Sequence, residues 1–347
     1  MQTKCSRLRM LENNYKFCNH IYYTTFFALC KRFMPLRIKT LSFILFCDTM
    51  LVEAFMNLEY KVIDNKYDNV KEILKAHFQV SDRLLTKLKK EKRIFLNDKP
   101  IYVTEKVKCG DFLKVDMNFI ETSDNIVPTK MNLDVVFEDE YLLVINKPAH
   151  IPVHPSCNHY ENSLSNGVKY YFNSINLPRK IRPINRLDKD TSGLVLFAKH
   201  EYIQEALVRQ MKSNTFQKEY IAILEGNLQE KSGTINAPIS RKAGSIMERE
   251  ISENGETAIS HFELIKNFEN YAEVKYTLET GRTHQLRVHS KYIGHPILGD
   301  TLYGEKSDLI DRQALHAFRI KFVHPITKEL ITLEAPIPND IEKLKSL

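Results

Sequence analysis

The stretch Arg182-Pro-Ile-Asn-Arg-Leu-Asp-Lys-Asp-Thr-Ser-Gly-Leu-Val-Leu-Phe-Ala-Lys199 joins a charged segment directly to a short apolar run. The apolar run, residues 194–198, predicts a fully buried strand. Residues 191–193, which precede it, predict a small polar turn where another backbone can come close. Arg186 and Asp188 are two positions apart, so in an extended segment their side chains leave the same face. We therefore expect a carboxylate, with an arginine beside it, at the mouth of a rigid core element, where a reacting group is well placed.

For an arbitrary aspartate, a structural ion pair or a turn cap would be the better interpretation, because such pairs are common. Here the segment Arg186-Leu-Asp-Lys-Asp-Thr-Ser-Gly-Leu194 resembles the signature of the RluA-type RNA pseudouridine synthases. The resemblance implies that Asp188 is the catalytic nucleophile. It also implies that Arg186 helps to displace or replace a base of the RNA.

The chain has 347 residues, which is enough for two domains, and its composition of 43% hydrophobic and 27% charged residues is that of a globular protein. A net charge of +7 favours a polyanionic partner such as nucleic acid. No two of the six cysteines have the CxxC spacing. Neither a zinc ribbon nor a redox dithiol is therefore predicted, and a reducing cytoplasm is the simplest location.

Residues 1–56 differ from the rest of the chain. Their two apolar patches, residues 21–30 and 41–47, are shorter than the 20 or so residues that cross a membrane, and no secretory signal pattern fits well. We expect this segment to be a non-native or disordered extension, with a targeting segment as the alternative, and no contact with membranes.

Residues 57–120 predict a small α+β module. Ser81 is a suitable N-cap for a helix whose leucines 84, 85 and 88 share one face. Arg83, Lys87 and Lys90 share another face of that helix, at helical spacing. A basic helix followed by short strands suits contacts with phosphates, although a solvated charged face explains the charges equally well.

The order of motifs in this module resembles the RNA-binding domain of small-subunit ribosomal protein S-four, which many RluA-type enzymes carry in front of the catalytic domain. The resemblance implies that Arg83, Lys87 and Lys90 bind RNA. Residues 121–130 are polar, contain a proline and predict a linker. The catalytic domain is then expected over residues 131–347.

Two further motifs extend the resemblance. In Lys218-Glu-Tyr220 the tyrosine would lie against the target base, and in Thr280-Gly-Arg-Thr-His-Gln-Leu-Arg287 the last arginine would pair with Asp188. Arg282 and His284 of the second motif are expected to contact RNA. Taken alone, Tyr220 is an ordinary strand aromatic and Arg287 a surface arginine.

The resemblance implies a pseudouridine synthase fold of the α+β class, with a mixed, mostly antiparallel sheet, flanking helices and a central cleft. It further implies an enzyme that converts uridine to pseudouridine in RNA, large-subunit ribosomal RNA first, without cofactor or metal. We expect a monomer. The sequence also lacks the phosphate-loop, dinucleotide, zinc-protease and serine-hydrolase motifs. The histidine pair His154 and His159, with Cys157 between them, has no further ligand at a recognisable spacing, so a metal or thiol site is not predicted there.

Two other functions stay open. The chain could be a catalytically silent RNA-binding or ribosome-assembly factor, or a glycoside hydrolase that uses Asp188 and Asp190 as its carboxylate pair. One departure from the family pattern also stands out: Asn185 occupies the position where a histidine is common. This histidine is not the nucleophile, so the change bears on how the RNA is held rather than on the reaction.

Overall fold

The computed structural model describes residues 56–156 and 159–345, and these residues fall within one compact unit. Of the N-terminal extension, only Met56 lies among the described residues. Its side chain is buried, and its backbone N–H and carbonyl both bond to the side chain of Asn118, at 2.9 and 3.2 Å.

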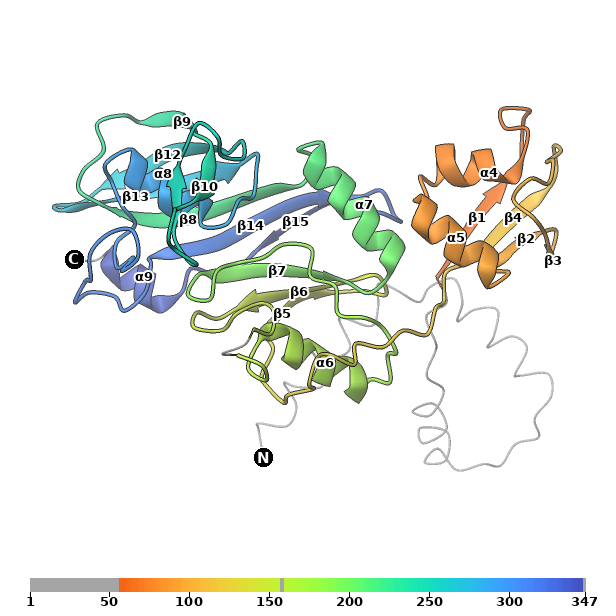
Figure 1. Ribbon diagram of the computed structural model, residues 1–347, viewed down its shortest axis with the longest axis horizontal. Coiled ribbons are helices and arrows are strands. Elements are labelled where there is room, and N and C mark those ends of the chain that lie inside the picture. Colours follow the sequence, from red (N-terminus) through yellow and green to blue (C-terminus); the bar gives the residue numbers. More distant parts are fainter. Residues whose placement is uncertain (1–55, 157–158, 346–347) are drawn as a thin grey trace, which may run out of the picture. The chain divides into compact units, whose positions relative to one another are not determined.

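The front module is a four-stranded antiparallel sheet with helices on it (Figure 1). Its strand order is β1 (Asn57–Lys61), β4 (Phe112–Asp116), β2 (Ile94–Leu96) and β3 (Lys99–Pro100). Helix α4 (Val70–Glu72) continues as a π-helical turn, Ile73–His77, before α5 (Asp82–Lys90). The predicted cap is confirmed: the Ser81 hydroxyl accepts from the Leu84 N–H at 3.1 Å, and the three leucines of α5 are buried.

The rest of the chain is built on one large, mostly antiparallel sheet, which confirms the expected fold class. Among the strands that the structure describes, only β7 and β14 pair in parallel. The strand order is β5 (Val135–Glu138), β6 (Leu142–Lys147), β7 (Ser192–Ala198), β14 (Leu315–Val323), β8 (Gln217–Glu225), β13 (Tyr271–Leu278), β12 (Ile259–Asn267) and β9 (Ser232–Asn236), with β15 (Leu330–Glu334) on β14. Strands β10 (Ile239–Arg241) and β11 (Arg249–Ile251) form a separate hairpin.

Helices cover both faces of this sheet. The alternating side chains of β6 and β7 enter two different cores, one with α6 (Leu164–Ser174) and one with α7 (Glu201–Lys212). Helix α9 (Asn339–Leu344) joins the α6 core, and α8 (Gln285–Tyr292) packs near β11 and β12. Every residue of β7 is buried, as the apolar run in the sequence predicts.

The position of the turn before β7 differs from the sequence prediction. Ser192 and Gly193 already belong to the strand, because β14 pairs with both of them. The turn lies earlier, where the Thr191 N–H bonds to the Asp188 carbonyl at 3.2 Å. The expected close approach of a second backbone is confirmed at Gly193: its φ is +117°, and a Cβ there would lie 2.2 Å from the Ala317 carbonyl oxygen.

The front module contacts the part of the chain built on the large sheet through α5 and α7. Lys87 bonds to Glu121 at 3.1 Å and to Glu201 at 3.5 Å, and its ammonium lies 3.7 Å from the centre of the Phe119 ring. In the described parts of the chain, no helix is both long enough and apolar enough to cross a membrane.

Candidate active site

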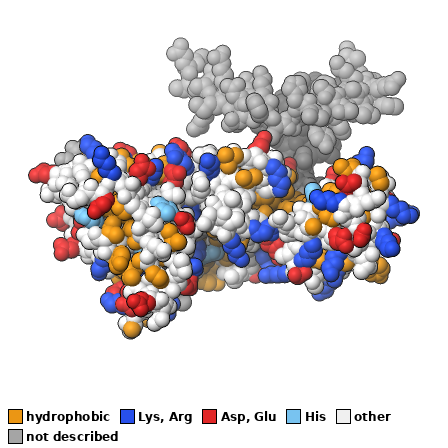
Figure 2. All heavy atoms as spheres, turned by 90° about the horizontal axis from the view of Figure 1, so that it is seen from above, with side chains coloured by type: hydrophobic (Ala, Val, Ile, Leu, Met, Phe, Trp, Pro, Cys, Tyr) orange, Lys and Arg blue, Asp and Glu red, His pale blue; other side chains and the backbone are white. Residues whose placement is uncertain are grey.

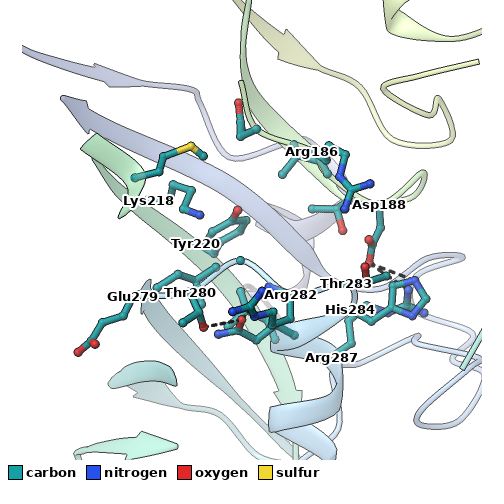
Figure 3. A pocket seen from close by; sticks show the side chains of 18 of the residues that line it. Arg186, Asp188, Lys218, Tyr220, Glu279, Thr280, Arg282, Thr283, His284 and Arg287 are labelled. Atoms are coloured by element: carbon teal, nitrogen blue, oxygen red, sulfur yellow. Dashed lines mark hydrogen bonds and ion pairs between the residues drawn. The ribbon is translucent and has the colours of Figure 1, made fainter. Parts of the chain in front are cut away.

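A pocket of about 690 Å³ brings six of the predicted site residues together (Figure 3). Its walls come from the segment before β7, the end of α7, the first half of β8 and the loop that leads into α8. The predicted residues that line it are Arg186, Asp188, Tyr220, Arg282, His284 and Arg287. They come from three separate segments, which the sheet holds side by side.

Asp188 and Arg287 form the ion pair that the family resemblance implies. Nη1 of Arg287 donates to Oδ2 of Asp188 at 3.1 Å, and the Asp188 side chain keeps 26% of its surface exposed. The guanidinium also binds both oxygens of Asp300, at 2.7 and 2.8 Å, and the Asp300 side chain is completely buried. Burial alone would lower the pKa of Arg287, but Asp300 and then Asp188 raise it. A permanent positive charge therefore faces the one carboxylate of this trio that is open to the pocket.

Two more buried basic side chains hold the backbone of the same loop; burial lowers the pKa of one of them, Lys147, to about 7, so its amine is only partly protonated at neutral pH. The fully buried Lys147, at the end of β6, donates to the carbonyls of Pro148, Ile151 and Lys189 at 2.8 to 2.9 Å. Arg312 donates to the carbonyl of Asp190 at 3.2 Å. Consecutive residues 188, 189 and 190 are thus each bound by a basic side chain from a different element. This arrangement fixes the position of the Asp188 carboxylate.

Tyr220 lies on β8 and reaches the pocket from the sheet. Its side chain is 7% exposed. Burial, and then the negative charge of Asp188, raise the pKa of its phenol, so the hydroxyl stays protonated at neutral pH. The side chain offers the pocket a flat aromatic surface and a neutral hydroxyl.

His284 precedes α8 in a left-handed conformation, with φ of 59°, and is bound by Tyr303. The Tyr303 hydroxyl accepts from the Arg249 N–H at 2.8 Å and lies 2.8 Å from Nδ1 of His284. The hydroxyl can therefore give its own proton to Nδ1, which leaves the proton of a neutral imidazole on Nε2, 3.9 Å from Asp188. Burial lowers the pKa of His284, which favours this neutral form.

The remaining predicted RNA-binding residues differ in exposure and in whether their side chains have partners within the protein. Arg186 is exposed at the pocket, whereas Arg282 is bound by Glu256 and by the Thr257 carbonyl at 3.0 Å. Arg83 and Lys87 line a second hollow of about 700 Å³ between α5 and α7, and Lys90 is exposed on α5. The structure therefore places the three α5 residues away from the Asp188 pocket.

The Asn185 side chain bonds to the backbone of β7 in the way that the backbone of a neighbouring strand would. Its amide donates to the Leu194 carbonyl and its oxygen accepts from the Leu196 N–H, both at 2.9 Å. The side chain is 5% exposed and pairs the segment before the turn with β7. Asn185 thus supports the position of the segment that carries Arg186 and Asp188.

Four residues that build the site were not predicted from the sequence: Lys147, Asp300, Tyr303 and Arg312. Asp300 and Tyr303 belong to the glycine-punctuated segment 294–304, which resembles a family motif, and Lys147 belongs to the Asn-Lys-Pro sequence that ends β6. Those motifs were the available signal. Nothing in the spacing relates any of the four to Asp188.

Among the described residues, no group of three or more His, Cys, Asp and Glu side chains is arranged to hold a metal ion. The pocket combines a partly exposed carboxylate held by a fixed cation, a protonated phenol and a neutral imidazole. Such a set can supply a carboxylate nucleophile and can stack a flat base.

Comparison with known proteins defines the class. Residues 141–292 match the family model described as RNA pseudouridylate synthase. The chain is 40% identical over 274 residues to "Uncharacterized RNA pseudouridine synthase YhcT" of Bacillus subtilis (strain 168), an alignment that covers 78% of this chain and 90% of that protein.

Two further similarities agree. The chain is 34% identical over 276 residues to "Ribosomal large subunit pseudouridine synthase D" of Neisseria meningitidis serogroup B (strain ATCC BAA-335 / MC58), covering 76% of this chain and 74% of that protein. A solved structure, "Human RNA Pseudouridylate Synthase Domain Containing 1", aligns with a TM-score of 0.50 and 27% identity over 59% of this chain and 83% of that one. The chain belongs to the RluA family of RNA pseudouridine synthases and is an enzyme of that class.

Proposed function

We propose that this enzyme converts uridine to pseudouridine in large-subunit ribosomal RNA, with Asp188 as the nucleophile and without metal or cofactor. The observation that carries the proposal is the partly exposed Asp188 carboxylate, bound at 3.1 Å by an arginine that a buried aspartate holds in turn. The ribosomal substrate is supported by the relatives named for large-subunit pseudouridine synthases.

In the reaction the bond from the uracil nitrogen N1 to the ribose breaks, the uracil turns, and its carbon C5 joins the ribose. The proton on C5 is lost and N1 gains one, so atoms and charge balance without a co-reactant. Asp188 attacks either the sugar or the base, and Arg287 keeps its carboxylate charged and oriented. Tyr220, which stays protonated, stacks on the uracil and holds it while it turns.

The target base has to leave its stack to reach this pocket, which costs a few kcal/mol. Phosphate contacts and stacking on an aromatic side chain offset that cost. Arg186, exposed beside the pocket, is placed to occupy the position that the base vacates. Arg282 and His284 line the same pocket and are proposed to contact the RNA next to the target.

We propose in addition that the front module is an S-four-like RNA-binding domain. Figure 2 shows its Lys and Arg side chains spread over the visible face and mixed with acidic ones, rather than gathered in one patch. Arg83 pairs with Glu201 through Nε at 3.4 Å but its side chain is 85% exposed, whereas Lys87 keeps its ammonium between two carboxylates. Arg83 and Lys90 are therefore the better candidates for phosphate contacts, and Arg83→Gln with Lys90→Gln is expected to weaken RNA binding without changing the reaction at bound sites.

The test is pseudouridine mapping across all RNA from cells that carry only Asp188→Asn, Asp190→Asn or the unchanged gene. We expect Asp188→Asn to lose every modification that depends on the gene. Asp190→Asn is the matched control, because its side chain bonds to His150 at 3.1 Å and not to Arg287. Unchanged modification with Asp188→Asn would overturn the nucleophile, and gene-dependent sites confined to transfer RNA would overturn the ribosomal substrate. Release of free uracil without pseudouridine would support a glycoside hydrolase.

A further inference from the structure

Lys218 is a pocket-lining cation to which neither the sequence motifs nor the reaction assigns a role. It precedes Tyr220 by two residues on β8, so both side chains leave the same face of the strand. Both line the pocket, and Figure 3 shows Tyr220 between Lys218 and Asp188. Lys218 therefore lies on the far side of the stacking residue from the proposed nucleophile.

The ammonium of Lys218 has no hydrogen-bond or ion-pair partner among the residues that the structure describes. Lys147, by comparison, reaches three carbonyls and Arg287 reaches two carboxylates. Burial lowers the pKa of Lys218, and no neighbouring acid opposes the effect. A half-buried ammonium without a partner is unfavourable in the free protein, because its lost hydration is not replaced. An anion that binds there therefore gains more binding free energy than one that binds a solvated lysine.

The surroundings of the ammonium leave room for a ligand. It lies against Gly281, where a Cβ would be only 3.1 Å from Nζ. Glycine thus leaves this part of the pocket open, whereas any side chain at position 281 would press on the ammonium. The charge of Asp188 acts on Tyr220 but not on Lys218, which agrees with their separation in the pocket.

We propose that Lys218 binds a backbone phosphate of the RNA next to the extruded uridine and so positions the target nucleotide between Tyr220 and Asp188. The proposal rests on the proposed function, in which the uridine lies against Tyr220 within reach of Asp188. In this proposal one of the two phosphate linkages that flank the uridine lies on the Lys218 side of Tyr220. A phosphate at Lys218 gives the ammonium the counter-charge that the protein does not supply.

The experiment measures binding, not turnover, and uses the full chain with Asp188→Asn. The probe is a synthetic RNA hairpin that carries the uridine identified by the mapping above. Lys218→Met is expected to raise Kd about 10-fold and to reduce the slope of log Kd against log salt by about 0.7, the value for one phosphate contact on a single strand. Lys218→Arg keeps the slope. The matched control is Lys275→Met, because Lys275 lies on the same sheet but is paired with Glu263 at 2.5 Å; it is expected to change neither quantity.

A second measurement identifies the atom that Lys218 contacts. A neutral methylphosphonate on the 5′ or the 3′ side of the target uridine should weaken binding at one of these two linkages, and Lys218→Met should remove that effect. If the methylphosphonate and Lys218→Met weakened binding independently, with additive losses, the phosphate contact would be overturned. A salt slope that is unchanged in Lys218→Met would also overturn it.

The stability of the free protein gives a further criterion. Since Lys218 lacks a partner, Lys218→Met should not lower the thermal stability, and a clear loss would overturn the proposal in favour of a structural role. The outcome is separate from that of the proposed function, because binding is measured where Asp188 is already replaced.

Discussion

Arg287 and Arg312 are two buried arginines that each bind an aspartate through two nitrogens, an arrangement called a fork here. The third guanidinium nitrogen, Nη1, has different partners in the two. Each binds both oxygens of an aspartate through Nε and Nη2: Arg287 binds Asp300 at 2.7 and 2.8 Å, and Arg312 binds Asp340 at 2.6 and 3.0 Å. From this fork, Nη1 of Arg287 reaches the carboxylate of Asp188. Nη1 of Arg312 instead reaches three backbone carbonyls, at 3.2 to 3.3 Å.

The difference separates a cation that takes part in the chemistry from one that shapes the loop. Asp300 is completely buried, whereas the Asp340 side chain is 41% exposed. The charge of Arg287 thus lies between a closed carboxylate and one that opens onto the pocket. The charge of Arg312 is shared among backbone dipoles and a solvated acid. We therefore expect changes at Arg287 to affect the rate and changes at Arg312 to affect the stability.

The largest contrast is expected between Arg287→Lys and Arg312→Lys. Lysine cannot form the two-pronged contact, so at position 287 it leaves Asp188 without an oriented cation. We expect the single-turnover rate of Arg287→Lys to fall about 10³-fold, or about 4 kcal/mol, the size of a lost preorganised electrostatic contact. Arg312→Lys should lower the melting temperature and leave the rate of the folded protein within about 5-fold, since it contacts no reacting atom. Equal rate losses in the two variants would remove the distinction.

Lys147 extends the comparison to a basic side chain that binds backbone alone. Lys147→Met leaves three carbonyls without this donor; each is part-buried at its contact with Lys147, and an unsatisfied buried group costs about 1–3 kcal/mol. We expect the free energy of unfolding in urea to fall by about 3 kcal/mol or more, together with a loss of rate, since Lys147 binds the carbonyl next to Asp188. Lys199→Met is the control: Lys199 is also buried and paired, with Glu138, but follows the far end of β7. It should lose stability without losing rate in the folded fraction.

A smaller effect on the rate is expected from substitution of Asp300 and Asp340, the aspartates that Arg287 and Arg312 bind. Asp300→Asn keeps the shape but removes the charge that holds Arg287, so we expect a rate loss of about 10–100-fold, or about 1.4–2.7 kcal/mol. Asp340→Asn, the matched change at Arg312, should leave the rate unaltered. Rates measured under single-turnover conditions with saturating enzyme separate this effect from RNA binding. A rate loss in Asp340→Asn of similar size would show that rigidity of the loop, rather than charge, controls the reaction.

The sequence predicted which segments form strands and helices better than it predicted which strands pair with one another. Periodicity located the buried strand β7 and the leucine face of α5, and the family motifs led to Asp188, Tyr220 and Arg287. The parallel pairing of β7 with β14 could not be read, because it joins segments more than 100 residues apart. For the same reason the turn was placed too late, at residues that β14 recruits into the strand.

Charge patterns were the weakest guide to the site. The charge pattern of α5 left RNA binding and a solvated face equally open, and the family resemblance implied RNA for Lys87; in the structure its ammonium lies between Glu121 and Glu201 from two other segments. Asp300 is 13 residues beyond Arg287 and carries no spacing signal that relates the two. Whether a cation meets an acid, a carbonyl or nothing at all is decided by the tertiary fold, as Lys87, Lys147 and Lys218 show in turn.

The last prediction concerns acid, and it tests the structural side of the comparison. His316 bonds through Nδ1 to Ser192 at 2.9 Å, where β7 begins, and His200 follows the end of the same strand. Burial lowers the pKa of His316 to about 4 and that of His200 to about 3. Both values lie below the 6.5 of an unfolded histidine, so below pH 6.5 the unfolded chain binds more protons than the folded one. Stability is therefore fully present above pH 6.5 and is lost as the pH falls toward 4.

Each of these histidines contributes a slope of about 1.4 kcal/mol per pH unit in that range. Urea unfolding between pH 7.5 and 4.5 should show the decline, and His316→Asn should reduce its slope by about one proton. His261→Asn is the control, because the His261 side chain on β12 is 37% exposed and its Nε2 lies 2.7 Å from the Glu279 carboxylate; it should leave the slope due to His316 and His200 in place. If the slope of unfolding free energy against pH were unchanged in His316→Asn, protonation of other groups would account for the loss of stability in acid. Since His316 and His200 lie at the two ends of β7, the predicted loss of stability concerns the strand that follows the Asp188 loop, on the same structural side of the comparison as Arg312.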